Sequence, residues 1–176
     1  MNLAFSGKMC AGKSTCAEMA CQIIGFDKSE RLSFADAIYE IAHEYWGMTQ
    51  KDRDLLIFIG ESWRARDPLI WVKIALEKIR ELNAQGKWVI IDDLRMPQEF
   101  EALSAAGFYM VRLNITEPEQ EKRLQTLYPD SFQEHLDKRN NLTECALDDT
   151  NILWDCYISH DLAEDMMKKS IQTILN

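Results

Sequence analysis

In the stretch AFSGKMCAGKST, residues 4–15, two glycines are followed by a lysine and two hydroxyl side chains in the order Gly7, Gly12, Lys13, Ser14, Thr15. The spacing Gly7-x-x-x-x-Gly12-Lys13-Ser14 is typical of a phosphate-binding loop. Glycines let such a loop turn tightly, so that successive amide N–H groups and a helix N-terminus point at one anion. Here a short apolar run precedes the pattern and a run with helical spacing follows it, as the loop requires.

Single residues of this loop have separate expected roles toward a nucleoside triphosphate. We expect Lys13 to reach the β- and γ-phosphates, Ser14 to hold Mg²⁺, and Thr15 to contact the α-phosphate. The residues expected to bind ATP are Gly7, Lys8, Cys10, Ala11, Gly12, Lys13, Ser14 and Thr15. The loop thus predicts ATP and Mg²⁺ as ligands, and leaves open what is done with them.

The other motifs of the chain separate the classes of protein that carry such a loop. A GTPase needs the motifs D-x-x-G and N-K-x-D, and neither occurs here. A motor-type ATPase usually needs more than 176 residues and couples to a partner. A small kinase needs a second phosphate site, an aspartate near Mg²⁺ and mobile basic residues. The sequence offers all three, which favours the kinase.

The aspartate candidates lie in VIIDDLRMP, residues 89–97, where an apolar run ends in two acidic residues. Side chains at the carboxyl end of a buried strand face the ligand in α/β sheets. We therefore expect Asp93 to hold the Mg²⁺ shell or to orient an acceptor phosphate, and Arg95 to pair bidentately with that phosphate. In the alternative, an aspartate only caps the next helix and Arg95 lies at the surface.

Three further residues are candidates for the acceptor site. Arg64 and Arg66, in the stretch WRARDP, either clamp a monophosphate or are solvated. Trp63 and Trp71 beside them are predicted to be core residues. Asp36, in SFADAIYEIA, either faces the acceptor or caps a helix.

Basic residues after the fourth predicted strand are candidates for a lid over the transferring phosphoryl group. A lid needs arginines that swing over the migrating charge and exclude water. Within a lid segment of about residues 117–145, we expect Arg123 to act in catalysis and Arg139 to bind substrate.

Strand-like and helical runs alternate along the chain, which predicts a parallel sheet with helices on both faces in one α/β domain over residues 1–176. Asp67 is expected to cap a helix that has Pro68 in its first turn. Residues 128–150 are expected to be irregular with one short helix. The strands are predicted at 3–6, 31–34, 87–93, 108–115 and 154–159, and the helices at 14–24, 38–45, 51–63, 67–85, 98–106, 117–127 and 162–175.

The composition excludes several other functions. The net charge is −9, and such a surface repels a polyanion, so we expect no polymeric nucleic acid as a partner. No run approaches the roughly 18 apolar residues of a membrane span, and no signal peptide is evident. The five cysteines show no C-x-x-C pair, which predicts reduced thiols in a cytoplasmic protein.

The order of the motifs GKMCAGKST, SFADAIYEIA, KDRDLLIFIGESWRARDPLIWV, VIIDDLRMPQEFEAL and LTECALDD resembles the deoxynucleoside monophosphate kinases of bacteriophages over nearly the whole chain. A weaker likeness runs to animal-type phosphomevalonate kinases, through Asp93-Leu94-Arg95 and the stretch Thr143 to Asp148. Dephospho-CoA kinases are more distant relatives of the same group.

The resemblance implies transfer of the ATP γ-phosphoryl group to a deoxynucleoside monophosphate, giving the diphosphate. It also implies a three-layer fold with a five-stranded parallel sheet, and an acceptor held between the second-strand region and the helices around residue 60. The expected partners are small nucleotides, with the chain a monomer or homodimer, in the host cytoplasm if a phage encodes it. The open alternatives are a kinase of another phosphorylated metabolite, and a nucleotide-binding module that makes no product.

Overall fold

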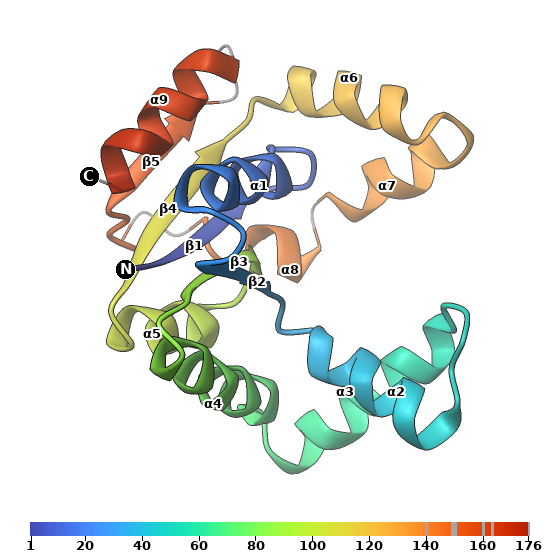
Figure 1. The fold of residues 1–176 in the computed structure, drawn as a ribbon. Helices are drawn as coiled ribbons and strands as arrows, with labels where there is room; N and C mark the ends of the chain where they lie inside the picture. The colour runs from blue at the N-terminus through green and yellow to red at the C-terminus, as the bar shows by residue number, and fades with distance from the viewer. Residues whose placement is uncertain (140, 149–150, 160, 163, 176) are drawn as a thin grey trace.

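Five parallel strands form one sheet at the centre of the molecule (Figure 1). A computed structural model describes residues 1–139, 141–148, 151–159, 161–162 and 164–175. The strands lie in the order β2-β3-β1-β4-β5. They are β1 (Asn2–Gly7), β2 (Ser29–Leu32), β3 (Trp88–Leu94), β4 (Phe108–Asn114) and β5 (Cys156–Ser159). The predicted α/β class with a five-stranded parallel sheet is confirmed.

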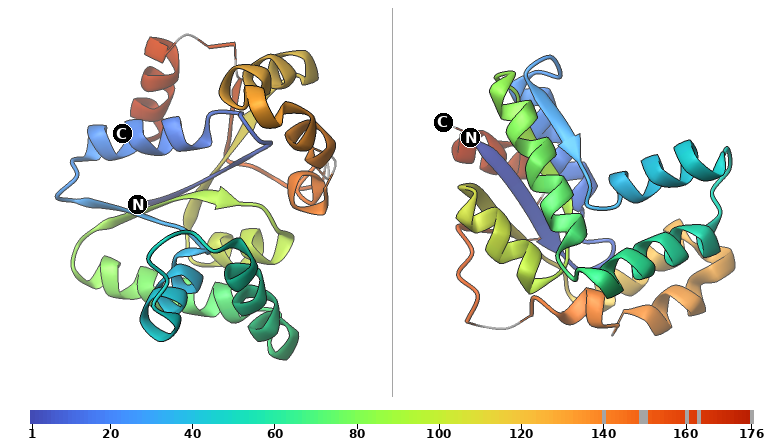
Figure 2. Two further views of the ribbon diagram at one scale, coloured as in Figure 1. Left: turned by 90° about the vertical axis from the view of Figure 1, so that its right-hand side faces the viewer. Right: turned by 90° about the horizontal axis from the view of Figure 1, so that it is seen from below.

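Helices cover both faces of the sheet, which gives three layers (Figure 2). One face packs against α1 (Lys13–Ile24) and α9 (Glu164–Leu175), and the other against α4 (Ile70–Ala84) and α5 (Pro97–Ala105). Because both faces are covered, consecutive residues of the central strand β1 are buried without alternation. Because the phosphate loop connects β1 to α1, it lies at the carboxyl end of the central strand.

Two groups of helices stand apart from the sheet (Figure 1). After β2, α2 (Asp36–Trp46) and α3 (Arg53–Arg66) pack against each other and the start of α4 around a small core of their own. After β4 come α6 (Glu117–Leu127), a 3-10 turn (Pro129–Ser131) and α7 (Phe132–Lys138), and the chain then returns to the sheet at α8 (Leu142–Cys145). Each group follows the carboxyl end of a strand. Both groups therefore lie at the edge of the sheet that carries the phosphate loop.

Several predictions of the secondary structure were wrong. The second strand begins at Ser29, two residues before the predicted start, because this buried serine pairs with Trp88. The helix expected from Asp67 begins at Ile70. Asp67 instead ends α3, and its Oδ1 accepts a hydrogen bond from the Leu69 amide at 3.0 Å. Within residues 128–150, the described part holds two short helices and the 3-10 turn where one helix was expected.

Among the described residues, no helix is both long enough and apolar enough to cross a membrane.

Candidate active site

The backbone of the phosphate loop takes left-handed conformations at three positions. The φ angles are +148° at Gly7, +100° at Gly12 and +62° at Cys10. A Cβ atom on Gly7 would lie 2.6 Å from the carbonyl oxygen of Leu113 in β4, so a side chain does not fit there. The glycine at position 7 is therefore required both by its backbone conformation and by close contact with the neighbouring strand.

The Lys13 side chain is folded over this loop and buried. Its Nζ donates hydrogen bonds to the carbonyl oxygens of Gly7, at 2.7 Å, and of Lys8, at 2.9 Å. Burial lowers the pKa of Lys13 from 10.5 to about 8, and repulsion from the Arg95 guanidinium adds to this shift. The loop thus holds a cation whose charged form is costly, which an anionic ligand would stabilise.

Asp93 lies at the carboxyl end of β3, next to the loop-bearing strand. Its Oδ2 accepts hydrogen bonds from the Ser33 hydroxyl at 2.5 Å and the Phe34 amide at 3.0 Å. Its Oδ1 is buried and has no hydrogen-bond partner in the described part of the chain. Burial raises the pKa of this carboxyl group. An unpartnered carboxylate oxygen fits a ligand of Mg²⁺, the role predicted for Asp93.

Arg95 is fixed at both its backbone and its side chain. Its amide donates to Glu99 Oε2 at 2.9 Å, which ties it to the start of α5. Its guanidinium Nη1 donates to Glu144 Oε1 in an ion pair. The other oxygen of Glu144 accepts from the Met9 amide of the phosphate loop at 2.6 Å. Arg95 therefore lies next to the loop, and Glu144 connects the two.

A second ion-pair network also contacts the loop, through Lys8. Asp148 pairs with Lys8 at 3.1 Å and with Arg112 at 2.5 Å. Arg112 is buried in β4 and also donates to the Ser6 hydroxyl at 3.0 Å. Sequence reasoning assigned no role to Glu144 or Arg112. The signal for Arg112 is a charged residue inside the apolar strand FYMVRLN.

The structure separates the two arginines predicted for the lid. Arg123 reaches the phosphate loop, where its Nη1 donates to the Cys10 carbonyl oxygen at 3.1 Å. Arg139 instead pairs with Glu121 at 2.6 Å and with Glu117 at 3.7 Å, both on α6. Only Arg123 is therefore brought to the site in this arrangement.

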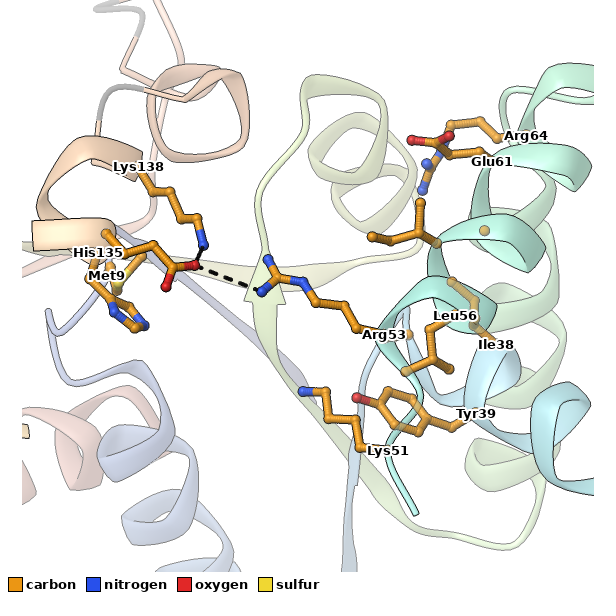
Figure 3. A pocket seen from close by; sticks show the side chains of 14 residues that line it. Met9, Ile38, Tyr39, Lys51, Arg53, Leu56, Glu61, Arg64, His135 and Lys138 are labelled. Atoms are coloured by element: carbon orange, nitrogen blue, oxygen red, sulfur yellow. Dashed lines mark hydrogen bonds and ion pairs between the residues drawn. The ribbon is translucent and has the colours of Figure 1, made fainter. Parts of the chain in front are cut away.

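An open cavity of about 790 Å³ lies between α3 and α7 and reaches Met9 of the phosphate loop (Figure 3). Tyr39, Lys51 and Arg53 extend into it from one side, opposite Met9 and the α7 side chains His135 and Lys138. Its charged lining comprises Lys51, Arg53, Arg64 and Lys138 against Glu61 and Glu134. The excess of cations suits an anionic ligand with an aromatic or apolar part.

The candidate acceptor residues are placed differently from one another. Arg64 lines this cavity, whereas Arg66 and Asp36 do not. Asp36 Oδ2 accepts from the Ser33 amide at 2.7 Å, so it holds the turn after β2. Trp71 is buried as predicted. The prediction that Trp63 is a core residue was wrong, because this side chain is exposed and only stacks on Trp71, with ring centroids 5.4 Å apart.

The described residues contain no cluster of three His, Cys, Asp or Glu side chains that could hold a metal ion. A metal at Asp93 and Ser14 would thus need phosphate oxygens to complete its shell, which is the usual arrangement for Mg²⁺.

Comparisons of the sequence with known proteins found a viral relative but no matching family model. The uncharacterized protein ORF77 of Ictalurid herpesvirus 1 (strain Auburn) is 30% identical over 156 residues, which cover 84% of this chain and 67% of the viral protein.

Two solved structures with a similar fold are those of kinases. A sugar kinase from Janibacter sp. HTCC2649 matches with a TM-score of 0.53 and 16% identity, over 99% of this chain and 93% of that one. The APS kinase of Mycobacterium tuberculosis, in complex with AMPPNP and APS, matches with a TM-score of 0.52 and 13% identity, over 99% and 95%. The chain therefore has the α/β fold of P-loop kinases, and it belongs to the same protein family as ORF77 of Ictalurid herpesvirus 1.

Proposed function

We propose that this protein is an ATP-dependent kinase that transfers the γ-phosphoryl group to a deoxynucleoside monophosphate and forms the diphosphate. The observation that carries this proposal is the position of Arg95. Its guanidinium lies beside the phosphate loop, tied to it through Glu144, so a second phosphate bound by Arg95 would be next to the donor. The cation-rich cavity between α3 and α7 is the space for the rest of the acceptor.

The donor side of the reaction would be served by the loop and by Lys13. The loop amides and the N-terminus of α1 bind the phosphates of ATP, and Lys13 stabilises the negative charge that develops between the β- and γ-phosphates. Asp93 Oδ1 and Ser14 would hold Mg²⁺, which when bound neutralises charge on the phosphates. Positioning and electrostatic stabilisation are thus the protein's whole contribution.

The acceptor side would be served by Arg95 and Arg64. Arg95 orients the acceptor phosphate in line with the γ-phosphate, and Arg64 binds it from the cavity wall. Arg123, already at the Cys10 carbonyl, would stabilise the equatorial oxygens of the transferring phosphoryl group. Arg139 would join them only by leaving Glu121, and Arg66 and Asp36 remain predictions without a contact to the cavity.

A second candidate function is a kinase whose acceptor is a hydroxyl group of a small metabolite. The raised pKa of Asp93 favours it, because a carboxylate with a raised pKa is a better acceptor for a hydroxyl proton. The two kinases of similar fold, one for a sugar and one bound to APS, are consistent with such an acceptor. A phosphomonoester acceptor needs no general base, which separates the two mechanisms.

To decide between the two candidate functions, a panel of acceptors is incubated with ATP and Mg²⁺. Phosphoryl transfer is measured by ADP release and by ³¹P NMR. Deoxynucleoside and ribonucleoside monophosphates, phosphomevalonate, dephospho-CoA, sugars and APS form the panel. A new diphosphate signal from a deoxynucleoside monophosphate supports the proposal, whereas a new monoester signal supports the second candidate. Tight ATP binding with no ADP release, whichever acceptor is present, would indicate a nucleotide-binding module that makes no product.

A further inference from the structure

Glu144 is a buried carboxylate placed between two parts of the site. Only 1% of its side chain is exposed. Oε1 accepts from the Arg95 guanidinium and Oε2 from the Met9 amide at 2.6 Å. A buried carboxylate is costly unless both oxygens are paired, and here both partners belong to the candidate active site. The residue thus has a specific pairing that a surface acid lacks.

The charges around Glu144 explain what it does. The positive charge of Arg95 acts on Lys13, since it helps to lower the lysine pKa, and Glu144 acts in the opposite direction. Two cations close together repel, so an arginine side chain without a counter-charge would turn outward to solvent. Glu144 supplies that counter-charge, because its Oε1 pairs with the Arg95 guanidinium.

The segment that carries Glu144 is held to the loop at a second point. Asp148, four residues on, pairs with Lys8 and Arg112. The segment therefore contacts the loop both at the Met9 amide and at the Lys8 side chain. A residue on it can fix the distance between Arg95 and the phosphate loop.

We propose that Glu144 is a positioning residue that holds the Arg95 guanidinium against the phosphate loop, so that acceptor and donor phosphates are bound in line. This inference rests on the proposed function. Glu144 itself would repel a phosphate, so its contribution to the reaction must pass through Arg95. The carboxylate's charge, rather than its volume, is what the role requires.

The test uses Glu144→Gln, which keeps the size of the side chain and an oxygen for the Met9 amide but removes the charge. We expect the Kd for ATP, measured by calorimetry without acceptor, to change less than about twofold. The acceptor KM should rise roughly tenfold or more, with a fall in kcat, because Arg95 is no longer held. In the background of Arg95→Ala, Glu144→Gln should cause no further loss in kcat/KM.

Asp148→Asn is the matched control from the same segment, since Asp148 contacts Lys8 and Arg112 rather than Arg95. Its effect should add to that of Arg95→Ala, because the two residues act independently. Equal losses from Glu144→Gln with and without Arg95 would show a merely structural role and overturn the proposal. Tighter ATP binding with unchanged acceptor kinetics would also overturn it, since the carboxylate would then only compete with phosphate.

A readout without acceptor separates this inference from the proposed function. In ¹⁵N-arginine-labelled protein, the Arg95 side-chain signal should show hindered rotation in the wild type and free rotation in Glu144→Gln. An Arg95 signal unaffected by Glu144→Gln would refute the positioning role whatever the acceptor. If the wild type phosphorylates no acceptor but this signal changes as expected, the proposed function fails and the positioning of Arg95 stands.

Discussion

Lys13 Nζ donates to the carbonyl oxygen of Gly7 at 2.7 Å, so the side chain bends back over the loop from which its own helix starts. A lysine held this way is desolvated before any phosphate arrives, and its pKa falls to about 8. Phosphates bound beside it would favour its charged form and raise the pKa again.

ATP binding should therefore take up protons in a pH window that begins near pH 8, where the free protein loses the Lys13 proton. Below that window Lys13 is charged both before and after binding, so no uptake is expected from it. As the pH rises through 8, the free protein loses the proton and the apparent affinity for ATP should fall. Calorimetry in buffers of different ionisation enthalpy measures the uptake.

Lys13→Met is the control for this linkage. It should abolish the uptake and lower turnover by several orders of magnitude, while far-UV circular dichroism stays that of the wild type. Equal proton uptake in both proteins would assign the linkage to another group.

The two loop glycines should differ in their tolerance of alanine. Gly7→Ala combines a positive φ with a Cβ 2.6 Å from the Leu113 carbonyl oxygen, so it should lower the free energy of unfolding by roughly 3 kcal/mol or more. The nearest atom to a Cβ on Gly12 is 3.7 Å away, so Gly12→Ala meets only the φ strain and should cost about 1–2 kcal/mol. Urea denaturation measures both, and the reverse order would contradict the packing of the loop on β4.

Local patterns in the sequence were enough to predict the sheet, the phosphate loop and the ends of β3, because apolar periodicity and glycine spacing are properties of neighbouring residues. The position of Asp93 and Arg95 was predicted for the same reason, since Asp93 lies at the end of a buried strand and Arg95 directly after it. The hydrogen-bond partners of the site residues were not predicted. Ser33 meets Asp93 from 60 positions away, and Glu144 meets Met9 from 135 positions away, and no local pattern encodes such contacts.

Arg64 and Arg66 provide a matched pair on the last turn of α3, because Arg64 lines the cavity and Arg66 does not. Arg64→Ala should raise the acceptor KM roughly tenfold, the value of one charged hydrogen bond, and leave the KM for ATP unchanged. Arg66→Ala should leave both constants within about twofold of the wild type. Steady-state kinetics with each substrate varied in turn would check this, and a larger effect from Arg66 would move the acceptor site away from the cavity.

Asp93→Asn should separate stability from activity. Burial raises the pKa of Asp93, so the folded protein bears a cost for its charge at neutral pH, and the amide removes that cost while its oxygen still accepts from Ser33 and Phe34. The Tm should therefore stay equal or rise, while kcat falls about 100-fold and more Mg²⁺ is needed for half-maximal rate. Asp92→Asn is the control, because Asp92 pairs with Arg31 at 2.7 Å and its loss should lower stability more than turnover. A Tm drop in Asp93→Asn with activity retained would make Asp93 a structural anchor for Ser33 and remove it from the metal site.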